Sequence, residues 1–195
     1  MDNIKLHLGC GKRHLPGYIH IDLDNEPHID YPNTNISKLD MFKDNEVDLI
    51  YTCGTFEYFD DPSRSPEVSH VLQEWFRVLK PGGILKISVP NFESVVQVYL
   101  NNGKDIFGEG ILGLIYGRWP ILNKDNEEEI LYHKMVYDFK SLSRVLKQSG
   151  FKDIKKYNWK EFLPKNFDDY SKAYVPYMDE TGLQMSLNIE CKKYR

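Results

Sequence analysis

The sequence has little cysteine, no long apolar run and no block of like charge. Its cysteines, Cys10, Cys53 and Cys191, are odd in number and lack the paired spacing of zinc ligands, so neither a disulfide framework nor a metal site is expected. No apolar run approaches the ~18 residues that a membrane-spanning helix needs. The 25 Lys and Arg nearly balance the 29 Asp and Glu, which disfavours nucleic acid as a partner.

The N-terminal residues 1–5 contain no apolar segment of the kind found in secretory signals. Together with the missing membrane span, this favours a cytoplasmic protein without a membrane partner. A length of 195 residues is enough for one well-buried core and too short for two. We therefore predict a single domain over residues 1–195.

What the sequence does have is a Gly-x-Gly turn between two apolar-rich strands. The first predicted strand covers residues 4–8, Gly9 and Gly11 follow it, and the second covers residues 18–22 and ends in Asp22. Glycine leaves no side chain between the main chain and a ligand, and a carboxylate at the next strand's end suits a ribose diol. The pattern predicts a nucleotide-type cofactor site. The link between the strands is shorter than a usual crossover, so we expect no first helix.

Downstream, strands and helices alternate as in an α/β fold. Residues 47–52 predict a buried strand, and apolar residues at intervals of three and four predict a helix over 65–79. Lys80-Pro81-Gly82-Gly83 is expected to end that helix, and 84–89 predict the next strand. A weak strand is expected at 28–31, within a polar loop.

The middle of the chain is predicted to cover the sheet's functional edge. Residues 92–117 predict a helix with an apolar face, and 118–129 predict a polar loop with an acidic run. We interpret 92–137 as a lid or substrate insertion. A further helix is expected over 139–150. Strands are expected at 151–156 and 185–191, and this pair can close the far edge of the sheet.

Four segments carry a family resemblance: Leu6-His7-Leu8-Gly9-Cys10-Gly11, Asp48-Leu49-Ile50-Tyr51, Glu74-Trp75-Phe76-Arg77-Val78-Leu79-Lys80-Pro81-Gly82-Gly83 and Ser149-Gly150-Phe151. Together they resemble the class I S-adenosylmethionine-dependent methyltransferases, in particular the methyltransferase type 11-like group. The resemblance implies a Rossmann-like, mostly parallel sheet with helices on both faces, here with a shortened first crossover and a helical lid. It also implies S-adenosylmethionine as the cofactor.

The resemblance assigns cofactor roles to particular positions. Gly9, Cys10 and Gly11 would pass beneath the methionine moiety, Asp22 would receive the ribose hydroxyls, and Leu23 would lie against the adenine. Asn35 stands where the family has an acidic residue for the adenine amino group, and it keeps an acceptor oxygen for that group. The remaining implied contacts are Ile36, beside the adenine, and Thr52 and Cys53, on the methionine side.

Two positions bear on catalysis. Glu57-Tyr58 stands where many relatives have Glu-His or His-His, so a base role of that histidine does not transfer to Tyr58. His133 follows the predicted lid, and its unperturbed pKa near neutrality suits a general base. The alternative is a surface or capping histidine.

The leading hypothesis is a methyltransferase that acts on a small molecule or saccharide intermediate by in-line transfer. The alternative is a non-catalytic protein that binds S-adenosylmethionine, motivated by Tyr58 and the missing first helix. A nicotinamide-dependent oxidoreductase is disfavoured, because the third glycine of the dinucleotide fingerprint is absent. The expected partner is a small-molecule acceptor, and the oligomeric state stays open.

Overall fold

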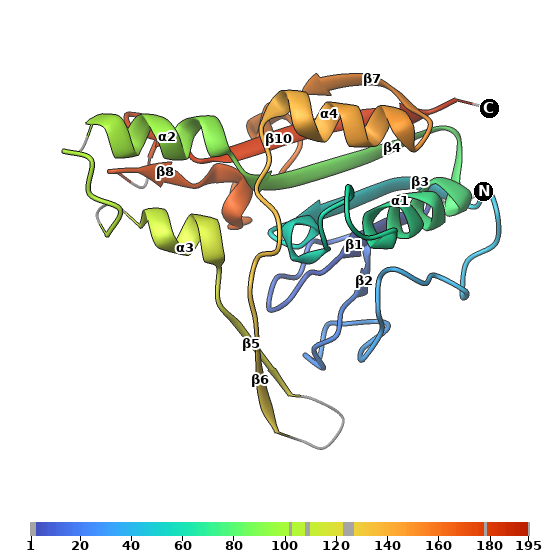
Figure 1. The fold of residues 1–195 in the computed structure, drawn as a ribbon. Helices are drawn as coiled ribbons and strands as arrows, with labels where there is room; N and C mark the ends of the chain where they lie inside the picture. Colours follow the sequence, from blue (N-terminus) through green and yellow to red (C-terminus); the bar gives the residue numbers. More distant parts are fainter. Residues whose placement is uncertain (1–2, 102, 108–109, 123–126, 178, 195) are drawn as a thin grey trace.

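A six-stranded sheet runs through the molecule (Figure 1). The computed structural model describes residues 3–101, 103–107, 110–122, 127–177 and 179–194. The strand order is β2-β1-β3-β4-β10-β7. The strands are β1 (Lys5–Leu8), β2 (Ile19–Ile21), β3 (Val47–Cys53), β4 (Leu79–Pro90), β7 (Phe151–Lys156) and β10 (Ser186–Lys193).

The sheet is mostly parallel. The pairs β2–β1, β1–β3 and β3–β4 are parallel, and β10 is antiparallel to both of its neighbours, β4 and β7. Four consecutive strands therefore end at the same edge, where ligands bind in open α/β sheets. The predicted α/β class and the mostly parallel sheet are confirmed.

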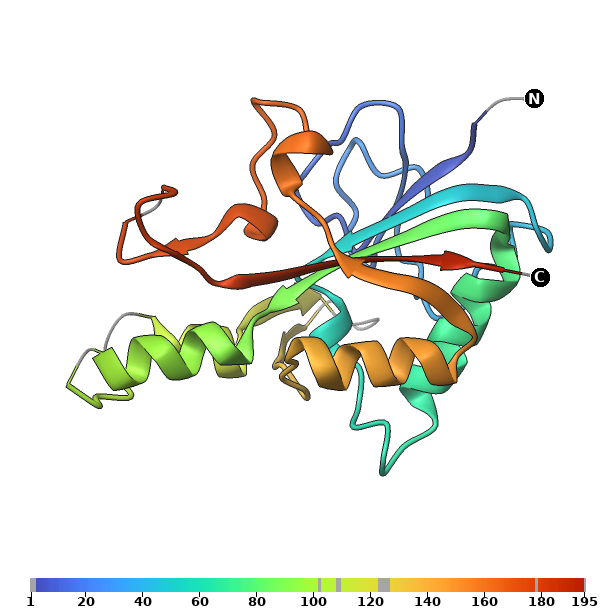
Figure 2. The same ribbon diagram turned by 90° about the horizontal axis from the view of Figure 1, so that it is seen from above.

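Four α-helices accompany the sheet in the described part of the chain: α1 (Glu67–Val78), α2 (Phe92–Asn101), α3 (Ile111–Tyr116) and α4 (Phe139–Gln148). Figure 2 shows α1, α2 and α4 on one side of the sheet. Trp75 of α1 and Leu142 of α4 are fully buried in the main core with Leu6 and Leu8 of β1. Residues three and four apart share a helix face, so the apolar spacing of α1 and α4 turns one stripe of each helix toward the sheet.

The other face is covered differently. Two short 3₁₀ helices, η2 (Trp159–Glu161) and η3 (Tyr170–Lys172), lie in the segment that crosses this face. Leu15, Leu163 and Phe167 form a second core cluster here with Tyr51 of β3. Helices thus lie on both faces, but the α-helices gather on one face, and loops with 3₁₀ turns cover the other.

The first crossover is short, as expected. No helix lies between β1 and β2, and two turns close the link: Arg13 N–H donates to the Cys10 carbonyl (3.0 Å), and Tyr18 N–H donates to the Leu15 carbonyl (3.3 Å). Leu15 is 2% exposed. A single buried side chain therefore does part of the covering that a crossover helix would do.

Several predicted boundaries are wrong. The strand expected at 28–31 is reduced to one parallel bridge between Tyr31 and Ile21. Strand β4 begins at Leu79, before the expected stop, with a register shift against β3. The helix expected over 92–117 is broken into α2 and α3, because Gly103 and Gly110 adopt φ values of +72° and +70°, which a right-handed helix does not allow.

The predicted polar loop at 118–129 is also wrong. Strands β5 (Trp119–Leu122) and β6 (Glu128–Leu131) form an antiparallel hairpin, and residues 123–126, which hold part of the acidic run, lie outside the described residues. Trp119 and Ile121, two positions apart, share one face of β5, and this strand signal was obscured by the acidic run. A second small sheet, β8 (Tyr174–Val175) with β9 (Leu183–Gln184), was not predicted either.

Within the described residues, no helix is both long and apolar enough to cross a membrane.

The buried histidine of β1 links the fold to pH. His7 is 1% exposed, its ring stacks on Tyr51 at 5.3 Å between centroids, and its Nδ1 has no partner among the described residues. Burial, and next the nearby His20, lower the pKa of His7 to about 3. A neutral imidazole is therefore built into the second core.

We predict that the replacement His7→Gln changes how stability depends on pH. In the unfolded chain His7 takes up a proton below about pH 6.5, whereas the folded protein resists protonation until about pH 3, so acidification destabilises the wild type. Between pH 7 and pH 5 the variant should gain about 2 kcal/mol relative to the wild type, measured by urea unfolding at both values. His70→Gln, at an exposed position of α1, is the control. An unchanged difference for His7→Gln would contradict the prediction.

Candidate active site

The carboxyl ends of the parallel strands border one cavity of about 800 Å³. This volume lies within the roughly 300–1,000 Å³ that ligand pockets occupy. Besides the strand ends, the hairpin β5–β6 and the segment before α4 line it. The predicted site residues that line it are Gly9, Cys10, Gly11, Asp22, Leu23, Asn35, Ile36, Cys53 and His133. Two of these predicted residues, Gly9 and His133, are 124 positions apart in the sequence and still line the same cavity.

Thr52 is the one predicted residue that does not line the cavity. It is fully buried, and its hydroxyl has no partner among the described residues. Successive residues of a strand face opposite sides, so Thr52 points away from the side that Cys53 reaches.

The Gly-x-Gly turn is held by close main-chain approach. Gly9 and Gly11 have φ values of +65° and +50°, and Gly9 N–H donates to the Ile21 carbonyl at 2.9 Å. A Cβ on Gly9 would lie 2.2 Å from the Thr55 hydroxyl oxygen, and one on Gly11 would lie 3.4 Å from the Trp119 ring. Gly9 is therefore required by the close approach of Thr55, whereas a Cβ on Gly11 would make an ordinary contact with Trp119 and glycine there is favoured by its positive φ.

Asp22 joins the turn to the end of β2. Its carboxylate accepts hydrogen bonds from Gly11 N–H (2.7 Å) and Asp24 N–H (2.9 Å). An ionised carboxylate has about four acceptor positions, so these two bonds leave acceptor capacity at the cavity wall. That capacity suits a vicinal diol.

The next part of the wall is mixed. Leu23 is half-exposed at the cavity, and Ile36 is buried there. Asn35 presents its side-chain oxygen to Ser37 N–H at 2.9 Å. Trp75 fixes the position of Ile36 by donating its indole N–H to the Ile36 carbonyl at 2.8 Å. This part can hold a flat, largely apolar ring.

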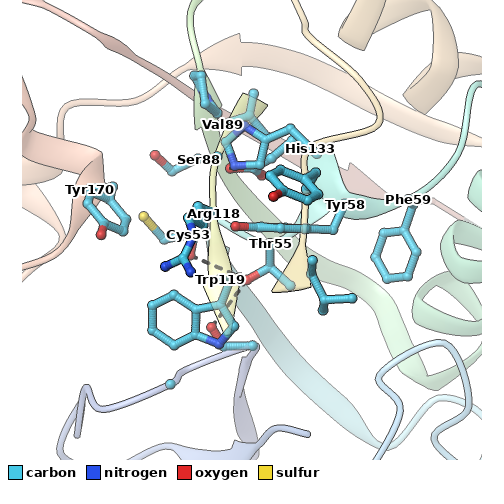
Figure 3. A pocket seen from close by; sticks show the side chains of 18 of the residues that line it. Cys53, Thr55, Tyr58, Phe59, Ser88, Val89, Arg118, Trp119, His133 and Tyr170 are labelled. Carbon is cyan, nitrogen blue, oxygen red and sulfur yellow. Dashed lines mark hydrogen bonds and ion pairs between the residues drawn. The ribbon is translucent and has the colours of Figure 1, made fainter. Parts of the chain in front are cut away.

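The opposite end of the cavity is built around η1 (Phe56–Tyr58), which follows β3. The Glu57 carbonyl accepts hydrogen bonds from Lys134 N–H (2.9 Å) and Met135 N–H (3.1 Å), so it anchors the segment that carries His133. The rings of His133 and Tyr58 meet edge to face at 4.7 Å between centroids. Figure 3 shows these two side chains together, with Tyr170 across the cavity from them.

Sequence reasoning missed several lining residues. Arg13, Thr55, Ser88 and Tyr170 all line the cavity, as does Trp119, for which the sequence offered only a general stacking role. Thr55 and Ser88 could have been found, because they lie at or just beyond the ends of parallel strands. Trp119 and Tyr170 reach the cavity from the hairpin and from η3, and no local pattern predicts either approach.

Tyr170 is placed by a buried polar network. Asp169 accepts hydrogen bonds from the Tyr51 hydroxyl and from Ser171 N–H (2.9 Å), which fixes η3 on the sheet. The Tyr170 ring then lies 3.0 Å from where a Cβ on Gly54 would be, and the Arg13 guanidinium stacks 4.7 Å from its centroid. The C-terminal part of the chain thereby forms one wall of the cavity.

Comparison with known proteins supports the family resemblance. Residues 6–87 match the family model of a methyltransferase domain. The resemblance to the class I S-adenosylmethionine-dependent methyltransferases is confirmed. The match implies S-adenosylmethionine as the cofactor, and it leaves the nicotinamide alternative without support. His133 and the segment 92–137 lie outside the matched residues.

Solved methyltransferases share the fold at low identity. One from Methanosarcina mazei is 18% identical with a TM-score of 0.54, covering 100% of this chain and 94% of the other. One from Archaeoglobus fulgidus is 16% identical with a TM-score of 0.55, covering 98% and 86%. The Burkholderia thailandensis 1,6-didemethyltoxoflavin-N1-methyltransferase, solved with that compound and S-adenosylhomocysteine, is 15% identical with a TM-score of 0.52, covering 98% and 71%. No curated protein matches the chain.

The cavity fits this cofactor. The Asp22 carboxylate has acceptor capacity for ribose hydroxyls, and the Leu23 and Ile36 side chains suit an adenine ring. The thiol of Cys10 is not a competing nucleophile, because burial raises its pKa to about 12. Burial likewise raises the pKa of Cys53. Among the described residues, no group of three or more His, Cys, Asp or Glu is arranged to hold a metal ion.

The two ionisable groups at the other end of the cavity, Glu57 and His133, are both shifted toward their neutral forms. Glu57 is 1% exposed, and burial raises its pKa to about 8. Burial also lowers the pKa of His133. Glu57 Oε1 lies 3.7 Å from His133 Nε2. At neutral pH the site therefore holds a protonated carboxyl group beside a neutral imidazole.

We predict that Gly9→Ala destabilises the fold more than Gly17→Ala does. Both glycines have positive φ, +65° and +81°, and a side chain there costs about 1–2 kcal/mol. Only the Gly9 position adds a clash with Thr55, since nothing lies within 4 Å of a Cβ on Gly17. Urea unfolding should rank Gly9→Ala clearly lower, and Thr55→Ala in the Gly9→Ala background should restore part of the loss. Equal costs for the two single variants would refute the contact's importance.

We predict that Glu57→Gln becomes more stable relative to the wild type as the pH rises. In the unfolded chain Glu57 loses its proton above about pH 4.5, while the folded protein keeps it until about pH 8, so wild-type stability falls across this range. Between pH 5 and pH 7 the difference should move by about 2 kcal/mol in favour of the variant. Urea unfolding measures it, with Glu93→Gln at an exposed site of α2 as the control. A shift of opposite sign would mean that Glu57 is ionised in the folded protein.

Proposed function

We propose that the chain transfers a methyl group from S-adenosylmethionine to a small-molecule acceptor, with His133 as a general base. The observation that carries the proposal is the continuity of one cavity of about 800 Å³ from the Gly-x-Gly turn to His133. The two ends have different chemistry: acceptor groups for a ribose at one, and a neutral imidazole at the other. A donor and an acceptor molecule are thereby brought together.

The bound cofactor supplies a methyl group on a sulfonium, which is already an activated leaving group. The protein's work is therefore mainly alignment and exclusion of water. The cavity is also lined by Cys53, Gly54 and Thr55, which lie at and just beyond the end of β3. Fixing two reactants in line can supply on the order of 7–11 kcal/mol in favourable cases.

A small acceptor is supported by how the cavity is enclosed. The hairpin β5–β6 lines one side with Trp119 and Ile121, and Tyr170 and Met185 line another. These walls suit a compact molecule with an apolar face, such as an aromatic ring or a saccharide derivative. The Burkholderia relative of the same fold, solved with a small heterocyclic compound, supports this class of acceptor.

The alternative is a protein that binds the cofactor without catalysis. Tyr58 motivates it, because it replaces the histidine of many relatives. The contact between Tyr58 and His133 favours the enzyme instead, since it places the imidazole of His133 beside the position where many relatives have a histidine. Methyl transfer to any acceptor would exclude the alternative.

We predict that Asp22→Ala weakens binding of both S-adenosylmethionine and S-adenosylhomocysteine by roughly 10- to 100-fold. Hydrogen bonds to a charged group contribute about 1.5–3 kcal/mol, and the variant also loses the bond that holds Gly11 N–H. Isothermal titration calorimetry measures the change, with the exposed Asp40→Asn as the control. If the folded wild type binds neither ligand, the proposed function fails.

A further inference from the structure

The tautomer of His133 is determined by the groups around its ring. Its Nδ1 lies 3.2 Å from the Leu114 carbonyl oxygen. A carbonyl only accepts hydrogen bonds, so Nδ1 carries the proton and Nε2 of the neutral ring has a free lone pair. Neutral His133 is therefore held as a proton acceptor at Nε2.

His133 is also fixed in position. Its backbone N–H donates to the Tyr116 carbonyl at 2.6 Å, and the following N–H of Lys134 donates to the Glu57 carbonyl at 2.9 Å. The ring lies so close to Gly117 that a Cβ there would be 2.3 Å from Nε2. The two main-chain bonds hold the segment and the Nδ1–Leu114 contact orients the ring, which is the preorganisation that a general base needs.

Glu57 faces the free lone pair without satisfying it. Glu57 Oε1 is 3.7 Å from His133 Nε2, which is beyond a hydrogen bond. The other oxygen, Oε2, is buried and has no partner among the described residues. An unpartnered buried oxygen is costly, so Oε2 needs a polar partner. The Nε2 lone pair is open to a ligand group that can donate a hydrogen bond.

From this geometry we propose that the acceptor presents a hydroxyl group, that His133 Nε2 takes its proton, and that Glu57 is the positioning residue of this base. The proposal rests on the proposed function. The hydroxyl oxygen forms a bond to the methyl carbon, the carbon–sulfur bond breaks with its electron pair left on sulfur, and the hydroxyl proton moves to Nε2. The sulfonium becomes a neutral thioether, and the imidazolium that forms lies beside the Glu57 carboxyl group.

The groups around the pair define its pH behaviour. Tyr58 and Glu57 face His133 from η1. The neighbouring Lys134 forms an ion pair with Glu67, with 3.6 Å between Nζ and Oε2. Cys53 and Tyr137 are the other titratable groups that the Glu57 charge reaches. Burial lowers the pKa of His133 below 6.5 and raises that of Glu57 to about 8. Activity should therefore rise as His133 becomes neutral, and rise again near pH 8, where an ionised Glu57 strengthens the base.

The first test needs no acceptor. Nitrogen-15 NMR of the histidine rings, with S-adenosylhomocysteine present, should find His133 as the Nδ1–H form at pH 7, and His133→Asn identifies the signal. In wild type the His133 shifts should respond to a titration near pH 8, and this response should vanish in Glu57→Gln but persist in the control Glu93→Gln. A proton on Nε2, or a titration unchanged in Glu57→Gln, overturns the proposal.

The second test locates the methyl group. Methyl-labelled S-adenosylmethionine is offered with matched probes, phenol against aniline and catechol against 1,2-diaminobenzene. Label on oxygen supports the proposal, with kcat at least tenfold lower in Glu57→Gln, the second rise near pH 8 lost, and the cofactor Kd unchanged. Preferential label on nitrogen overturns it. If no probe is labelled while the NMR result holds, the failure counts against the proposed function and leaves the Glu57–His133 pair standing.

Discussion

The contact between Gly9 and Thr55 is the constraint on which the rest of the site depends. Thr55 follows β3 and lies directly over the turn that leaves β1, and its hydroxyl donates to the Gly9 carbonyl at 3.2 Å. Only a residue without a side chain allows the two strand ends to come this close. The turn then carries Gly11 to the Asp22 carboxylate, and the segment after Thr55 becomes η1 with Glu57. Both ends of the cavity thus derive from one close approach.

The sequence predicted well the part of the site that lies on consecutive strand ends. Gly9, Gly11 and Asp22 could be placed because parallel strands deliver their carboxyl ends to one edge, a rule that needs only element order, whereas Cys53 was implied by the family resemblance. Thr52 failed as a cavity residue for an equally simple reason, since neighbouring positions on a strand face opposite ways. The fold class followed from the same alternation of strands and helices.

What could not be predicted depends on packing between distant segments. Trp119 and Tyr170 reach the cavity because the hairpin and η3 are docked by tertiary contacts, and the hairpin's strand signal was hidden by adjacent acidic residues. His133 was recognised as a candidate, but its tautomer and its pairing with Glu57 arise from the Leu114 carbonyl and from burial. Residue type indicated what His133 can do, and only the surroundings define which nitrogen does it.

The cavity walls come from three regions of the chain: the strand ends, the hairpin with Trp119, and the C-terminal segment with Tyr170. A molecule that fills the space between them touches all three and acts as an added piece of core. Such a ligand stabilises the folded state by mass action, by about 2.7 kcal/mol at a hundred times its Kd. The free energy of unfolding would then rise with the concentration of the methyl donor or of its demethylated product. The stability of the protein would therefore depend on how much of either ligand its surroundings contain.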